Sequence, residues 1–160
     1  MRKLSTPARP TGWERLAFRA PILLYRLRLG WLLGGRFMLL EHVGRATGEL
    51  HRTVVEVIEH DAPTDSYVAA SGFGTRSDWY RNLLAHPRAT IQVGRRTVAV
   101  DAVPMPQDEG GELMARYATR HDAAARKLCR FMGFEVDGSA EDYRAVGREL
   151  PFVRFAPVAG

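Results

Sequence analysis

The sequence predicts a mixed α+β fold, mainly antiparallel strands in a sheet or small barrel, in a single domain. The chain has 160 residues, 46% of them hydrophobic, which is enough for one compact core and short for two. Short β-rich runs follow one another between residues 36 and 104 with only one helical segment among them. The other helical patterns lie before residue 30 and after residue 106.

The N-terminal region has two parts. The first twelve residues, MRKLSTPARPTG, contain two prolines and few apolar side chains, so we expect a flexible arm over 1–12 and one domain over 13–160. From Trp13 to Leu29, apolar residues recur at spacings of three and four, which predicts an amphipathic helix. Pro21 lacks the amide proton that a helix interior needs, so this helix is either kinked or divided into two.

The middle of the chain has the pattern of strands. Residues 36–60 predict a β-hairpin, because the apolar run RFMLLEHVG and the β-branched run HRTVVEVIEHD flank the turn GRATGEL. SYVAASG predicts a third strand, and TIQVGRRTVAVDAVP predicts two more that meet at Gly94 and stop at Pro104. Between them, Ser77 can cap a helix from Asp78 to about Ala85, which His86 and Pro87 end.

The C-terminal part has the pattern of helices. DEGGELMARYATR, DAAARKLCRFMGF and AEDYRAVGREL predict a C-terminal helical block, and PFVRFAP can return to the sheet as a last strand. The total is about six mostly antiparallel strands, together with the N-terminal amphipathic helix and the helical block.

Charge and cysteine content limit the partners and the compartment. Residues 1–52 hold 10 Lys/Arg against 3 Asp/Glu, whereas residues 53–160 hold 13 against 15, so the net charge of +5 comes from the N-terminal third. This asymmetry suits an anionic partner: nucleic acid, a membrane surface or an acidic ligand. The single Cys129 favours a reducing compartment and hence a cytoplasmic location. Arg26, Arg28 and Arg36 interrupt the apolar run that a signal peptide or spanning helix needs.

Several chemistries lack their usual residues. His42, His51 and His60 have no Cys, Asp or Glu cluster at ligand spacing, so we expect no metal site. Cys129 lies on an apolar helical face, which is typical of a structural cysteine. Ser77 occupies the place of the third glycine in a dinucleotide-binding loop, which argues against a Rossmann site. No aromatic-interleaved basic motif supports nucleic-acid binding.

Two segments nevertheless suggest an anionic ligand. In ASGFGTRS, Gly72 and Gly74 can expose backbone N–H groups next to the start of the helix after Ser77, although the same pattern also fits a plain turn. In GRATGELHR, Arg45 and Arg52 can fork onto phosphate or carboxylate oxygens, although arginines in a hairpin are usually solvated. Together the two segments favour a single anionic ligand.

The same two segments carry a family resemblance. FMLLEHVGRATGELHRTVVEV followed by YVAASGFGTRSDWYRNLLAHPRATIQV resembles the deazaflavin-dependent nitroreductase family, a branch of the split-barrel flavin/deazaflavin oxidoreductases of actinobacteria, over roughly residues 36–100. The resemblance implies a split β-barrel that binds coenzyme F420, with FMN less favoured, and that reduces a hydrophobic electron-poor acceptor: a quinone, an enone, an unsaturated lipid or a nitro compound. LYRLRLGWLLGGRFMLL is similar to a sub-branch linked to lipid-like substrates.

Carried over by position, the resemblance also implies site residues. The tail of the coenzyme would contact Arg45, Thr47 and Arg52. Its phosphate or the edge of its ring would contact Ser71, Gly72, Phe73 and Gly74, and its ring would contact Val54 and Val55. Trp79 and Asn82 would support these residues from behind. Tyr143 is the candidate aromatic near the substrate and, with solvent as the alternative, a candidate proton donor.

Two departures from the family pattern leave alternatives open. Well-known members carry lysines where this chain has Ala46 and Gly72, so a binding protein for a flavin, deazaflavin or other anionic ligand without turnover remains an alternative to the enzyme.

The basic N-terminal helix could rest on anionic lipid at the inner face of the cell membrane. It could equally pack on the barrel or on the second subunit of a homodimer.

Overall fold

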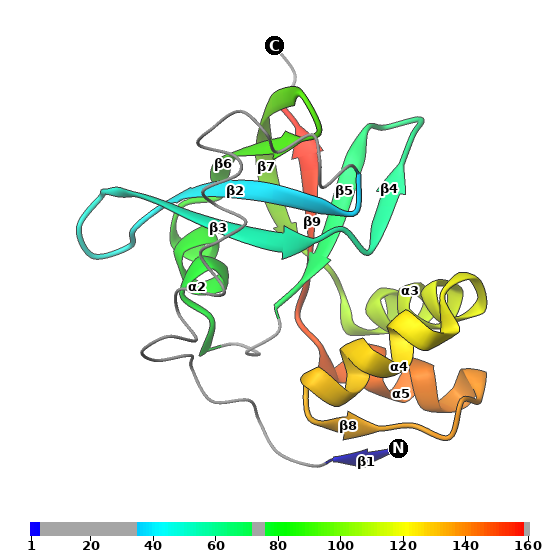
Figure 1. Ribbon diagram of the computed structural model, residues 1–160. Helices are drawn as coiled ribbons and strands as arrows, with labels where there is room; N and C mark the ends of the chain where they lie inside the picture. The colour runs from blue at the N-terminus through cyan, green and yellow to red at the C-terminus, as the bar shows by residue number, and fades with distance from the viewer. Residues whose placement is uncertain (4–34, 72–75, 159–160) are drawn as a thin grey trace, which may run out of the picture.

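The computed structural model describes residues 1–3, 35–71 and 76–158, and its largest element is an antiparallel sheet (Figure 1). Seven strands lie in the order β3-β2-β6-β7-β9-β5-β4, and every neighbouring pair is antiparallel. The strands are β2 Phe37–Val43, β3 Leu50–Glu56, β4 Glu59–Asp61, β5 Ser66–Ala70, β6 Arg88–Val93, β7 Arg96–Pro104 and β9 Phe152–Pro157. The mixed α+β fold with a curled antiparallel sheet, expected from the sequence, is confirmed.

The two edge strands of this sheet are consecutive in the chain. Only Val57 and Ile58 separate β3 from β4. The N–H of Val57 donates to the Arg36 carbonyl at 2.7 Å, while the N–H of Ile58 donates to the Val68 carbonyl at 2.8 Å. One nearly continuous segment therefore follows both edges, and the sheet curls into a split barrel. The predicted single strand over 51–60 is thus divided, which gives seven strands in place of about six.

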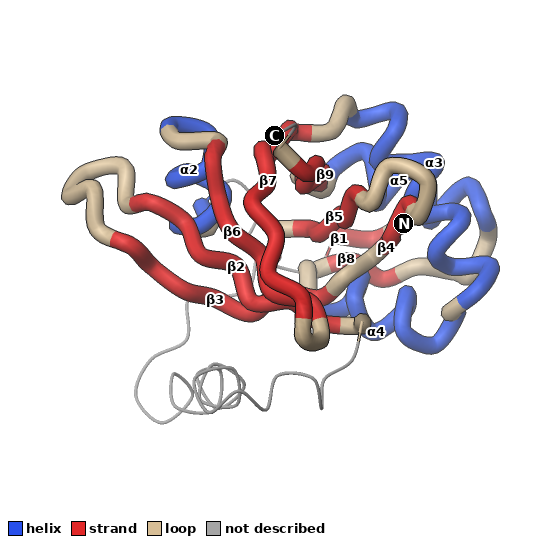
Figure 2. The backbone as a smooth tube through the Cα atoms, turned by 90° about the horizontal axis from the view of Figure 1, so that it is seen from above, coloured by secondary structure: helices blue, strands red, loops and turns tan. Residues whose placement is uncertain are grey.

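The described helices lie on two sides of the sheet. The helix α2, Asp78–Ala85, has the predicted bounds and lies next to the β2–β3 hairpin. The block of α3 Gln107–Arg120, α4 Asp122–Phe131 and α5 Ala140–Glu149 lies on the opposite side, as Figures 1 and 2 both show. The predicted helix over 122–134 ends early, because Gly133 takes a φ of 93° and β8, Phe134–Glu135, pairs with β1, Arg2–Lys3.

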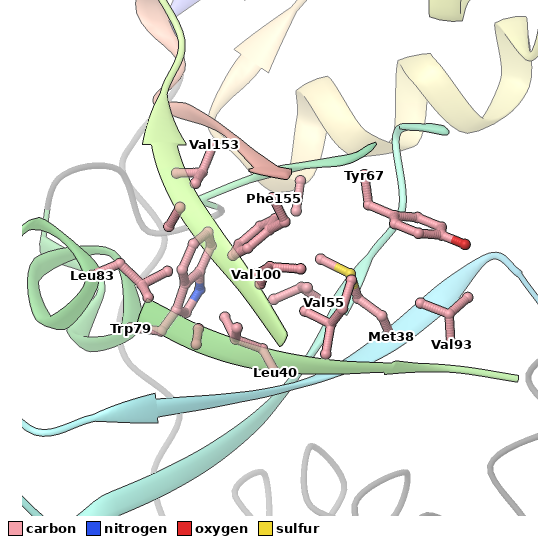
Figure 3. Close-up of a cluster of buried hydrophobic side chains, with 14 residues drawn as sticks. Met38, Leu40, Val55, Tyr67, Trp79, Leu83, Val93, Val100, Val153 and Phe155 are labelled. Carbon is pink, nitrogen blue, oxygen red and sulfur yellow. The ribbon is translucent and has the colours of Figure 1, made fainter. Parts of the chain in front are cut away.

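Alternation along the strands fills the barrel interior. Met38 and Leu40 of β2 point inwards beside their partner strand's Val55, and all three are buried. From α2, Trp79 and Leu83 join the same cluster, which Figure 3 shows as sticks. The short helix therefore closes one end of the barrel, and its position next to the β2–β3 hairpin depends on that packing.

A second core joins the barrel to the helical block. On β5, Val68 belongs to this second cluster while its neighbour Tyr67 belongs to the barrel interior. On β9, Phe152 and Val153 divide in the same way. Because successive side chains of a strand point to opposite faces, these two strands are buried on both sides. This explains why SYVAA and PFVRFAP are almost continuously apolar.

Within the block, α3 and α5 cross at glycines. A Cβ atom at Gly147 would overlap the Gly110 carbonyl oxygen and lie 2.8 Å from the Cα of Gly111. The two helices can thus approach backbone to backbone only because these positions lack side chains.

The predictions for the N-terminal region concern residues that are largely outside the described part of the chain. The expected helix from Trp13 to Leu29 lies outside the described residues. Of the expected arm over 1–12 only residues 1–3 are described, so the division into an arm and a domain over 13–160 stays a prediction. None of the helices in the described ranges combines the length and apolar character needed to cross a membrane.

Candidate functional site

The turn of the β2–β3 hairpin, residues 44–49, is braced from within. The Gly44 N–H donates to the Glu49 carbonyl at 2.8 Å, and the Thr47 hydroxyl oxygen accepts the Glu49 N–H at 3.2 Å. Gly48 has a φ of 73°, a conformation that favours glycine. The turn predicted from GRATGEL is therefore held in one shape by its own hydrogen bonds, and this fixes the backbone position of Arg45.

Arg45 is anchored to α2. Its backbone N–H donates to the Asn82 Oδ1 at 3.1 Å, and its Nη1 donates to the same oxygen at 2.7 Å. Its Nη2 lies 3.4 Å from the Asp78 carboxylate. Asn82 is 4% exposed, so its amide oxygen depends on Arg45 for these bonds. Two predicted site residues from distant parts of the chain are thus in direct contact.

His42 completes this network. Its Nδ1 lies 3.0 Å from the Asn82 Nδ2, which donates to it, and its ring stacks on His51 at 5.7 Å. Burial, with a smaller contribution from His51, lowers the pKa of His42 from 6.5 to about 4, although Asp78 acts in the opposite direction. The ring is neutral at pH 7 and can accept the amide hydrogen. We call His42, Asn82 and Arg45 the hairpin latch.

From the sequence, His42 was considered only as a possible metal ligand and was given no role in the site. The signal that could have singled it out is the alternation of β2, which places His42 on the inward face with Met38 and Leu40. An inward polar ring needs a hydrogen-bond partner, and the asparagine in WYRN supplies it.

The N-terminus of α2 lies beside the hairpin. Ser77 precedes the helix as predicted, but its hydroxyl makes no capping hydrogen bond. Ser71 is fully buried, and its N–H donates to the Pro151 carbonyl at 2.9 Å, which fixes the end of β5. The predicted residues Gly72, Phe73 and Gly74 lie between Ser71 and Ser77 in the sequence, outside the described residues.

The predicted residues of β3 divide between two faces. Val55 points into the barrel core, whereas Val54 pairs with Leu39 on the outward face. Arg52 shares that outward face and forms an ion pair with Glu41 at 2.9 Å. Val54 and Val55 therefore cannot line one surface together, and only Val54 is on the same side as Arg52.

Tyr143 lies in the helical block. It is 2% exposed, belongs to the second core and donates its hydroxyl to Asp122 at 3.0 Å. Burial and the bond to Asp122 raise the pKa of Tyr143 to about 12. The structure thus brings together Arg45 and Asn82, places Trp79 in the barrel core below them, and sets Tyr143 in the other core.

Other candidate groups have structural environments. Burial raises the pKa of the Cys129 thiol to about 11, so it stays protonated at neutral pH. Across residues 35–71 and 76–158, with 1–3, there is no group of three His, Cys, Asp or Glu side chains placed to hold a metal ion.

Solved structures resemble the fold at low sequence identity. HutZ, the heme storage protein of Vibrio cholerae, has a TM-score of 0.54 and 12% identity over 86% of this chain and 92% of its own. An FMN-binding protein related to pyridoxamine 5'-phosphate oxidase from Nostoc punctiforme has a TM-score of 0.52 and 19% identity, over 93% and 82%. An F420-H2 dependent reductase, FDR-A, has a TM-score of 0.49 and 16% identity, over 75% and 93%.

A family model gives the more specific match. The model of the F420H(2)-dependent quinone reductases matches residues 26–128, well over half of the chain. This span includes the whole hairpin latch and the segment that leads from β5 into α2. The protein is thus a reductase that uses coenzyme F420, and the chain belongs to the F420H(2)-dependent quinone reductase family.

Proposed function

We propose that this reductase transfers a hydride to a hydrophobic, electron-poor acceptor, with the coenzyme tail held on the β2–β3 hairpin. The acceptor would be a quinone, an enone, an unsaturated lipid or a nitro compound. The observation that carries the proposal is the hairpin latch, because Asn82 holds Arg45 beside the helix that follows the glycine loop. The coenzyme supplies the hydride chemistry, and the chain binds and orients it.

The donors of the hairpin fit an anionic tail. Arg45 donates from Nη1 to Asn82 and from Nη2 to Asp78, and its side chain is still 33% exposed. Arg52 uses its Nε for Glu41 and is 44% exposed. A guanidinium has five N–H groups, so both arginines keep donors for carboxylate or phosphate oxygens.

The charge balance predicts moderate affinity. Asp78 and Glu41 already offset part of the charge of the two arginines. Ala46 is exposed in the turn and adds no charge where family members carry a lysine. We therefore propose that coenzyme binding depends steeply on salt, since partly exposed ion pairs are screened.

We propose different roles for the remaining predicted residues. Thr47 shapes the turn, Gly72, Phe73 and Gly74 contact the phosphate or ring edge, and the buried Ser71 fixes the end of β5 that leads into them. Val54 faces the ring from the outward side of β3, while Val55 and Trp79 support it from the barrel core. These roles follow from the face on which each described residue lies.

Solvent is the favoured proton source. The Tyr143 hydroxyl already donates to Asp122, and its pKa near 12 makes proton loss at neutral pH costly. We propose that Tyr143 supports the helical block while water protonates the reduced product.

The test is a fluorescence titration with coenzyme F420. We expect the native chain to bind, and Asn82→Ala to weaken binding about tenfold, because Arg45 loses the oxygen that positions it. The matched control is Gln107→Ala, which removes an exposed amide at the start of α3, on the other side of the sheet, and should leave the affinity within about twofold. Equal effects of the two substitutions would contradict the role of the latch.

Turnover separates the two functions left open by the sequence. With reduced coenzyme, menadione and a nitroaromatic compound serve as acceptors, and coenzyme oxidation is followed by absorbance. Turnover of either compound supports the reductase with a hydrophobic acceptor. Binding without turnover of any quinone, enone or nitro compound would favour the alternative, a non-catalytic coenzyme-binding protein. No binding at tens of micromolar coenzyme would rule out both.

Location and assembly are separate proposals. We propose a cytoplasmic protein that contacts the inner face of the membrane through the expected helix at 13–29, and that forms a homodimer. Co-sedimentation with anionic vesicles tests the membrane contact, and sedimentation velocity tests the homodimer. A protein that stays in the supernatant would contradict the membrane contact, and a monomer would contradict the homodimer.

A further inference from the structure

A cleft distinct from the hairpin latch lies between the β3–β4 segment and α3. Its volume is about 550 Å³, within the range of small-molecule sites. It is lined by Gly35, Arg36, Glu56, Val57, Ile58, Glu59, His60, Asp61, Ala62, Pro63, Leu113, Arg116, Tyr117, Arg120 and His121. None of the residues predicted to hold the coenzyme is among them, and α3 lies on the other side of the sheet from α2 (Figures 1 and 2).

The cleft has an apolar part. Ile58 and Leu113 are buried in the second core, and Val57 packs against the first. The ring of Tyr117 is 7% exposed and fixed by its hydroxyl, which donates to Glu56 at 3.0 Å. These side chains form a surface suited to an apolar or aromatic body.

The carboxylates of the cleft already have partners. Glu59 forms an ion pair with Arg116 at 3.2 Å, and Glu56 accepts the hydrogen bond from Tyr117. Asp61 accepts a hydrogen bond from the Thr64 hydroxyl. Their acceptor oxygens are therefore partly used by the protein itself.

Two arginines are differently placed. Within the described part of the chain, neither Arg36 nor Arg120 forms an ion pair with a carboxylate, and both are exposed. Arg36 lies near the Tyr117 phenol. Burial raises the pKa of this phenol, and the positive charge of Arg36 has a smaller effect in the opposite direction. The guanidinium groups on the rim can fork onto a carboxylate or phosphate.

We propose that this cleft is a second binding site, for an amphipathic anion with an apolar or aromatic body and one anionic head group, a carboxylate or a phosphate. The head group contacts Arg36 and Arg120, and the body covers Val57, Ile58 and the Tyr117 ring. The lining holds three arginines and three carboxylates, so it favours a ligand with a single anionic head group over a polyanion. The proposal is independent of the coenzyme site.

The test uses two dyes with the same aromatic body. We expect 8-anilinonaphthalene-1-sulfonate, an anion, to bind the native full-length chain at least tenfold more tightly than the neutral N-phenyl-1-naphthylamine. In Arg36→Ala/Arg120→Ala, binding of the anionic dye should weaken at least tenfold, with the neutral dye unchanged within twofold. The matched control, Arg88→Ala/Lys127→Ala, removes two exposed cations elsewhere and should leave both dyes unchanged within twofold.

Competition identifies the head group and the site. Dodecanoate and dodecyl phosphate are compared with dodecanol. Displacement of the dye by dodecanoate assigns a carboxylate ligand, and displacement by dodecyl phosphate assigns a phosphate ligand. Equal displacement by dodecanol overturns the proposal.

Coenzyme F420 should not displace the dye; displacement would place the dye in the coenzyme site and overturn the proposal. Equal dye binding in both double variants would also overturn it. Circular dichroism confirms that each variant is folded. If coenzyme F420 fails to bind, the proposed function fails while the dye result stands.

Discussion

The two sides of the barrel differ in what their strands carry outwards. On the β5–β9 side, Val68 and Phe152 face the helical block while their neighbours face the barrel, so both surfaces are core. On the β2–β3 side, Met38, Leu40 and Val55 are buried on the inward face. The outward row has the buried Leu39, but it also carries the Glu41–Arg52 pair and the 68% exposed Leu50. A strand buried on both faces stabilises the fold. A strand with one outward face can also present charge to a ligand.

The largest expected effect tests the two cores of the β5–β9 side. Phe152→Ala and Phe155→Ala should each lower the free energy of unfolding by about 3–5 kcal/mol, because both rings are fully buried. The control is Phe131→Ala, which removes a ring that is 45% exposed and should cost less than about 1 kcal/mol. Urea denaturation gives all three values.

The same variants distinguish the cores. The ring of Phe155 lies 6.3 Å from that of Trp79, whereas Phe152 faces the helical block. Phe155→Ala should therefore shift the indole N–H resonance of Trp79 in NMR spectra, and Phe152→Ala should leave it in place. Equal shifts would mean that the two cores respond as one.

The next effect tests the latch through pH. The unfolded chain binds a proton at His42 with a pKa near 6.5, whereas the folded chain does so only near 4. Between these values the unfolded state holds more protons, so the free energy of unfolding falls as the pH is lowered from about 6.5 to 4, by up to about 3 kcal/mol. Denaturation of the native chain and of His42→Gln across this window measures it. Parallel pH profiles would show that His42 is not kept neutral by the fold.

The smallest effect tests the outward face of β3. Replacing Glu41 with Gln removes a partly exposed ion pair and should change the free energy of unfolding by less than about 1 kcal/mol. The same change leaves Arg52 without its carboxylate, so coenzyme F420 should bind about two- to fivefold more tightly, while Arg52→Ala should weaken binding. A large loss of stability with unchanged coenzyme binding would make this pair a structural feature.

Local patterns predicted much of the fold. The bounds of α2 were predicted from Ser77, His86 and Pro87, although the Ser77 hydroxyl does not cap the helix. The β2–β3 hairpin was predicted from its alternation and its glycine turn. The division of 51–60 into two edge strands did not follow. The pairing of Ile58 with Val68 depends on how far the whole sheet curls, and residues 57 and 58 have no turn signal.

The candidate site was predicted only in part. Arg45 and Asn82 came from the family resemblance, but their direct contact and the role of His42 depend on the packing of α2 against the barrel. Position matching also grouped Val54 with Val55, which strand geometry separates. The cleft beside α3 has no sequence motif, because its residues come from three separate segments.

The uninterrupted passage from β3 to β4 limits where the chain can change in length. Side chains of a strand alternate, so inserting one residue between Val57 and Ile58 would turn the rest of the segment over and exchange its core and outer faces. It would also shift the wall of the cleft relative to the hairpin. We expect this protein to accept an extra residue in the turns at 44–49 or 62–65, and to lose its fold when the residue is placed at 57–58.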